Sequence, residues 1–73
     1  MTHAESTRSE LLAAIEELGR IHPDWRLGQL LANLAMNAGR LDAGGVWELE
    51  DEEALTSARE LIAQLTMPEN VVV

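Results

Sequence analysis

The chain of 73 residues has no cysteine, no lysine, no phenylalanine and no tyrosine. Without cysteine it can form neither disulfides nor thiolate zinc sites. The two histidines, His3 and His22, are too few to build a structural metal site by themselves. We therefore predict no metal and no cofactor. A core this small often gains stability from a partner, so oligomerisation is the first route to consider.

Long apolar runs are also missing, because no stretch reaches the ~18 apolar residues of a membrane span. The sequence does not open on a basic segment followed by an apolar one, so we expect a cytoplasmic protein with no membrane contact. Thirteen acidic residues face only five arginines, giving a net charge of −8. This charge repels phosphate backbones, which argues against direct nucleic-acid binding and favours a basic protein partner.

Hydrophobic residues make up 47% of the chain, and with only two tryptophans they are mostly leucine, isoleucine and alanine. Such a core suits helices better than sheets. We predict one all-α domain over residues 1–73, with three helices near 8–21, 25–38 and 51–66. A glycine-containing loop joins the second helix to the third, and residues 1–6 and 68–73 are expected to be flexible.

The ends of the helices carry recognisable signals. Thr7 with Glu10 matches a capping box for the first helix, with Ser6 as an alternative cap. Asp24 is expected to cap the second helix, and Gly39 to stop it in a left-handed conformation. The third helix is expected to start in the acidic run 48–53, where acids complement the positive end of a helix.

The second helix carries no charge from Leu27 to Gly39. In a chain with 25% charged residues, this predicts a helix covered on more than one side. It is then either the central helix or a helix that faces another copy of the chain. Three apolar loop residues, Val46, Trp47 and Leu49, are expected to fold back onto the helices, with Trp25 and Trp47 closing the two ends of the loop region.

Arg26 is placed in the first turn of the second helix, where the helix dipole disfavours a cation. We expect either an ion pair with Glu50 or Asp51, or a solvated surface arginine. Gly28 costs roughly 1 kcal/mol inside a helix. Either another backbone approaches closely there, or the first turn tolerates the glycine.

Gln29, Asn33 and Asn37 continue from Arg26 along one side of the helix, either as groups that recognise a partner or as a plain polar face. The acidic run 48–53 could dock a basic surface or serve only the helix start. The candidate interaction residues are Trp25, Arg26, Gln29, Asn33, Asn37, Trp47, Glu50 and Asp51. No catalytic residue can be named, because no acid–base pair, nucleophile or cofactor loop is recognisable.

Two segments follow a recurring pattern: Pro-Asp-Trp-Arg-Leu-Gly-Gln-Leu from Pro23, and Glu-Asp-Glu-Glu-Ala-Leu from Glu50. They resemble small uncharacterised bacterial and phage proteins with Pro-Asp-x-Arg-x-Gly-Gln-Leu, a short loop and an acidic Glu-Asp-x-Glu-Leu helix start. The resemblance covers roughly residues 22–55. This chain departs from the pattern by Ala54 before Leu55 and by a longer loop. The resemblance implies a defined compact fold and transfers no chemistry.

These observations predict a non-enzymatic, acidic protein-interaction module: an adaptor, an inhibitor or a regulator that binds a protein partner or a second copy of itself. The alternative is a nucleic-acid mimic of phage or mobile-element type that occupies a basic DNA-binding surface. Mimicry needs acids spaced along an extended face, whereas here they bunch at 48–53.

Overall fold

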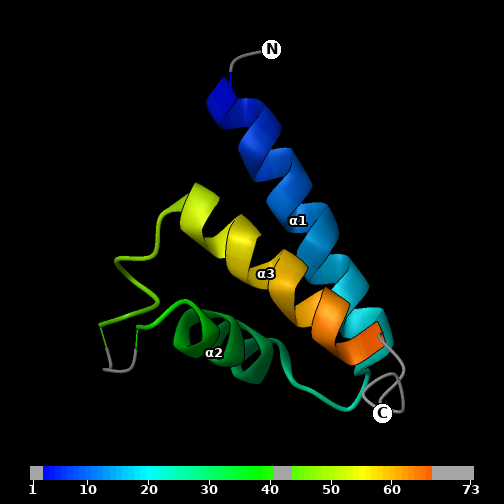
Figure 1. Cartoon of the computed structure of the whole chain (residues 1–73). Coiled ribbons are helices and arrows are strands. Elements are labelled where there is room, and N and C mark those ends of the chain that lie inside the picture. The colour runs from blue at the N-terminus through cyan, green and yellow to red at the C-terminus, as the bar shows by residue number, and fades with distance from the viewer. Residues whose placement is uncertain (1–2, 41–43, 67–73) are drawn as a thin grey trace, which may run out of the picture.

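The computed structural model describes residues 3–40 and 44–66 of the chain. Within these residues the secondary structure is three α-helices: α1 (His3–Ile21), α2 (Leu27–Asn37) and α3 (Asp51–Thr66). Helices α1 and α3 lie side by side along most of α3, and α2 lies on the other side of α3 (Figure 1). The predicted all-α three-helix fold is confirmed, and the third helix has the predicted bounds.

The core lies where the three helices meet, and it consists of leucine and alanine side chains. Leu18 of α1, Leu34 of α2 and Ala58 of α3 are almost completely buried. The other members of the buried cluster are Leu11, Ala14, Leu30, Ala54 and Leu55. The two alanines of α3 are small, which lets the neighbouring leucines fill the space between helices. Packing of apolar faces, rather than local propensity, holds such short helices together.

Helix α1 begins at His3, earlier than predicted. Thr7 and Ser6 lie inside this helix, so neither residue caps it, and residues 3–6 are helical rather than a loose lead-in. Thr7 is only 6% exposed, because this part of α1 packs near Glu52 and Leu55 of α3. The tertiary contact thus extends the helix past the expected capping box.

Helix α2 begins at Leu27, and its N-cap residue is Arg26 in an extended conformation with no side-chain cap. Asp24 therefore does not cap the helix. Residues 22–25 instead form a turn in which the Trp25 amide donates to the His22 carbonyl at 3.1 Å. In this turn the Asp24 carboxylate lies 3.5 Å from Nδ1 of His22.

Gly39 ends α2 as predicted, with a positive φ of 91°. Its amide donates to the Met36 carbonyl at 3.0 Å, and the Arg40 amide donates to the Ala35 carbonyl at 2.9 Å. These two bonds form a Schellman motif, which needs a left-handed residue at the position of Gly39. The motif fixes the direction in which the chain leaves α2.

The central helix is α3, which lies between the other two (Figure 1). Of the two alternatives for the uncharged second helix, the central position is therefore wrong, and only Leu30, Leu34 and Ala35 of α2 are buried. The described residues leave Leu27, Gly28, Gln29, Ala32 and Met36 of α2 exposed. No helix in the described ranges is both long and apolar enough to cross a membrane. The predictions for residues 67–73 lie outside the described residues.

The loop before α3 differs from expectation in part. Leu49 packs against the core as predicted. Val46 and Trp47 do not fold back: Trp47 is 91% exposed, and Val46 is also exposed. Trp25, by contrast, packs against the core from the turn before α2. The two tryptophans therefore do not close the loop region as a pair.

Candidate interaction surface

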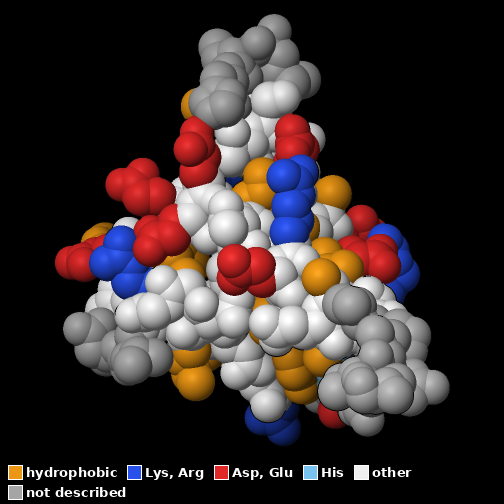
Figure 2. Space-filling model, viewed as in Figure 1, with side chains coloured by type: hydrophobic (Ala, Val, Ile, Leu, Met, Phe, Trp, Pro, Cys, Tyr) orange, Lys and Arg blue, Asp and Glu red, His pale blue; other side chains and the backbone are white. Residues whose placement is uncertain are grey.

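An open groove lies between the first half of α1, the loop after residue 43 and the start of α3. Its lining residues are Ala4, Thr7, Arg8 and the seven consecutive residues from Trp47 to Glu53. Its volume is about 1090 Å³. Carboxylates dominate the lining, and Figure 2 shows acidic side chains gathered around the start of α3. We call this feature the Trp47 groove.

The wall of the groove is fixed by an ion pair between the two helices. Nε of Arg8 in α1 lies 2.8 Å from Oδ2 of Asp51, and Nη2 lies 3.2 Å from Oδ1. Two parallel bonds of this kind give a guanidinium–carboxylate pair a defined geometry. Asp51 is the first residue of α3, so this pair ties the start of α3 to α1.

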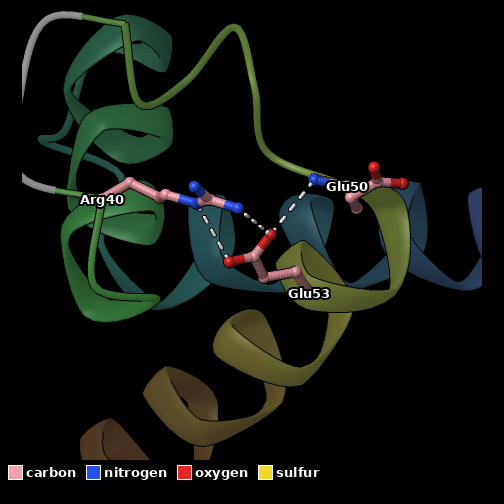
Figure 3. A network of polar contacts seen from close by, with 3 residues as sticks. All are labelled: Arg40, Glu50 and Glu53. Atoms are coloured by element: carbon pink, nitrogen blue, oxygen red, sulfur yellow. Dashed lines mark hydrogen bonds and ion pairs between the residues drawn. The ribbon is translucent and has the colours of Figure 1, made fainter.

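A second ion pair joins the end of α2 to the start of α3 (Figure 3). Arg40 donates to Glu53 through Nη2 to Oε1 at 3.0 Å and through Nε to Oε2 at 3.1 Å. The same carboxylate accepts the Glu50 amide at 3.4 Å, which caps the first turn of α3. The hydrogen bond from Arg40 lowers the pKa of Glu53 below its ordinary value, against the opposing effect of desolvation.

Glu48 and Glu50 differ from Asp51 and Glu53 because their carboxylates form no ion pair within the described residues. The Glu50 side chain points away from the Arg40–Glu53 pair (Figure 3). Both residues are exposed, and they lie one and three positions after Trp47 in the chain. The groove therefore presents an open indole ring and two uncompensated carboxylates. Indole faces and carboxylates both attract cations, which is the chemistry needed to hold an arginine or lysine side chain.

The residues singled out from the sequence fall into two separate places. The Trp47 groove contains Trp47, Glu50 and Asp51. The other five lie in or next to α2: Trp25, Arg26, Gln29, Asn33 and Asn37. The predicted pairing of Arg26 with Glu50 or Asp51 is wrong, because Asp51 is bound by Arg8 and the described residues give Arg26 no ion pair. Arg26 is an exposed arginine, the alternative interpretation.

Asn37 does not belong to an exposed polar face, because its side chain forms hydrogen bonds with α3. Its Nδ2 donates to Oγ of Ser57 at 2.9 Å and also lies 3.1 Å from Oε1 of Glu60. The Ser57 hydroxyl in turn donates to the Leu34 carbonyl at 2.7 Å. Ser57 is 2% exposed, so this network fastens α2 to α3 inside the molecule. Gln29, two turns earlier, is exposed.

The structure also places Trp25, in the turn before α2, and Gly28, in its first turn. Trp25 stacks on the His22 ring, with ring centroids 4.3 Å apart and planes 5° from parallel. Its ring is therefore partly used by the turn before α2. A Cβ atom built on Gly28 would meet nothing within 4 Å among the described residues, so no other described backbone approaches it. Within the described residues Gly28 is therefore a glycine tolerated in the first turn of α2.

Comparison with protein-family models, with curated proteins and with solved structures finds no match for this chain.

Sequence reasoning did not single out Arg8, Arg40, Glu53 or Ser57 as residues that organise the surface. Arg8 and Asp51 are 43 positions apart, and no local pattern links them. Glu53 did carry a signal, because an acid three positions after a helix cap commonly bonds back to the cap amide. Arg40 follows Gly39 directly, but only the Schellman geometry shows that it turns toward α3.

Proposed function

We propose that the chain is a non-enzymatic protein-interaction module that binds a basic, extended segment of a partner protein in the Trp47 groove. The observation that carries the proposal is the Trp47 indole, 91% exposed beside the unpaired carboxylates of Glu48 and Glu50. Exposed tryptophans are common energetic centres of protein interfaces. The net charge of −8 would also speed the encounter with a basic partner.

The ion pairs around the groove support a binding surface that is arranged in advance. Arg8 and Arg40 hold the first turn of α3 in place from both sides. The two arginines form ion pairs with Asp51 and Glu53. Glu48 and Glu50 therefore remain available to pair with an incoming cation. A surface that needs little reordering loses less entropy on binding. The proposed cytoplasmic location rests on the sequence pattern alone.

Nucleic-acid mimicry is the weaker candidate. It needs free carboxylates along an extended face, whereas Asp51 and Glu53 are bound to arginines and the unpaired Glu48 and Glu50 lie together beside Trp47. A mimic would use acids across its whole face, so carboxylates outside the Trp47 groove would contribute as much as those inside it. A comparison of matched charge variants therefore separates the two functions.

The test uses a fluorescein-labelled, end-blocked octapeptide of alternating arginine and glycine, titrated with the full chain by fluorescence anisotropy. We expect Trp47→Ala to weaken binding at least about tenfold, while Leu12→Ala, at an exposed leucine of α1, leaves it unchanged. We also expect Glu48→Gln/Glu50→Gln to weaken binding more than Glu16→Gln/Glu17→Gln, which removes the same charge from two α1 carboxylates that are paired with Arg20. Equal losses in the two double variants would contradict the proposal and favour mimicry.

A further inference from the structure

The face of α2 turned away from α3 has no cover within the described residues. Four residues on this face are exposed: Gly28, Gln29, Ala32 and Met36. The exposed fraction of Met36 is 54%. The helix has no charged residue from Leu27 to Asn37. An uncharged helix in a chain of net charge −8 is normally covered, and here nothing in the described chain covers it.

We propose that this face binds a second copy of the chain, with the two α2 helices packed antiparallel about a two-fold axis at Ala32. Gly28, Ala32 and Met36 follow one another at intervals of four, so they form one line along the helix. In the antiparallel arrangement Ala32 meets Ala32, and Met36 of each copy meets Gly28 of the other. The long, flexible Met36 side chain fills the open space above the glycine.

This arrangement also gives a role to two features at the start of α2. Gly28 lowers the stability of the helix, and a Cβ atom there would meet nothing among the described residues. Arg26 is at the N-terminal end of α2, where its charge opposes the helix dipole, and no residue of the last turn of α2 is basic. Antiparallel packing sets each Arg26 beside the negative C-terminal end of the other α2.

Charge further favours a copy of the chain at this face. Two molecules of net charge −8 repel each other wherever their carboxylates meet, and α2 presents none. A two-fold interface must be complementary to itself. Here the space above Gly28 receives Met36 of the other copy, and Arg26 lies beside the negative C-terminal end of the other α2. A face of three helical turns is small, so the dimer is weak and depends on concentration.

The test is sedimentation velocity of the full chain over a hundredfold range of concentration. We expect a monomer–dimer equilibrium, weakened at least about tenfold by Ala32→Glu, which sets two carboxylates against each other at the axis. The matched control is Ala13→Glu, the same change at an exposed position of α1, which leaves the equilibrium unchanged. A chain that stays monomeric throughout, or a dimer insensitive to Ala32→Glu, would overturn the proposal.

Single cysteines test the direction of packing, because the natural chain has none. Ala32→Cys should oxidise to a covalent dimer faster than Ala13→Cys. A mixture of Gly28→Cys and Met36→Cys should form mixed dimers faster than either variant pairs with itself. Parallel packing would instead give fast pairing within each variant, which would overturn the antiparallel arrangement.

Discussion

The side-chain amide of Asn37, the last residue of α2, donates a hydrogen bond to the hydroxyl of Ser57 in the middle of α3, with 2.9 Å between Nδ2 and Oγ. The Ser57 hydroxyl also donates a hydrogen bond to the Leu34 carbonyl of α2 at 2.7 Å. One buried hydroxyl thus serves as acceptor and donor between the two helices. It is the polar counterpart of the leucine and alanine packing around it.

Ser57→Ala should lower the free energy of unfolding by about 1 kcal/mol, because it removes the buried hydroxyl that accepts from the Asn37 side chain and donates to the Leu34 carbonyl. Urea denaturation followed by circular dichroism measures the loss. Ser9→Ala, at an exposed position of α1, is the control and should change stability little. A loss at residue 57 no larger than the loss at residue 9 would show that the network does not fasten α2.

A double-mutant cycle should find coupling between Arg8 and Asp51 and none between Arg26 and Asp51. Arg8 and Asp51 are joined by hydrogen bonds of 2.8 and 3.2 Å, whereas the described residues show no such bond between Arg26 and Asp51. Both partners are accessible to water, so the coupling should fade as salt is raised from 10 mM to 1 M, where the screening length is roughly 3 Å. Additive losses for Arg8→Ala and Asp51→Ala at low salt would refute the ion pair.

The Arg40–Glu53 pair should make stability depend on pH in the acid range. The hydrogen bond from Arg40 lowers the pKa of Glu53 in the folded protein below its ordinary value of 4.5. The folded state therefore binds this proton less readily than the unfolded state does. The stabilisation is present above the unfolded pKa and is lost as pH falls through the folded pKa.

Urea unfolding of the natural chain and of Glu53→Gln across pH 2–7 checks this expectation. The stability difference between the two proteins should be constant above about pH 5.5 and shrink steadily below the ordinary glutamate range. Glu48→Gln, at an exposed carboxylate that forms no ion pair within the described residues, provides the comparison. The same difference for Glu53→Gln at pH 2 and pH 7 would disprove the role assigned to Arg40.

Two glycine substitutions should have opposite signs. Gly39→Ala should destabilise the fold by about 1–2 kcal/mol, because a φ of 91° strains any residue with a Cβ atom. Gly28→Ala should instead stabilise the isolated chain by about 0.5–1 kcal/mol, since its Cβ meets nothing and alanine favours the helix. Thermal unfolding at low protein concentration measures both changes, and a shift of the same sign in the two variants would contradict the assigned conformations.

The features that follow from local physics could be predicted from the sequence. The spacing of Leu11 and Leu18 identifies a buried face, and Gly39 identifies the end of α2. Features that depend on how the helices meet could not be predicted. Thr7 looks like a cap in sequence, but packing against α3 extends the helix past it.

The candidate surface shows the same division. The acidic start of α3 is visible in the sequence, whereas its pairing with Arg8 and Arg40 depends on where α1 and α2 lie. The sequence predicts that Trp47 folds back onto the helices, as large apolar side chains usually do. Leucine and alanine fill the core instead, and Trp47 is exposed.

We propose that Trp47, Glu48 and Glu50 bind a basic segment as one surface. The most direct measurement is a ¹H–¹⁵N NMR titration of the full chain with the unlabelled arginine–glycine octapeptide. We predict saturable shifts in the Trp47 indole N–H and in the amides of residues 47–53, with the Trp25 indole unaffected. Shifts spread evenly over the backbone amides of all the acidic residues, without a response of the Trp47 indole, would contradict binding in the Trp47 groove.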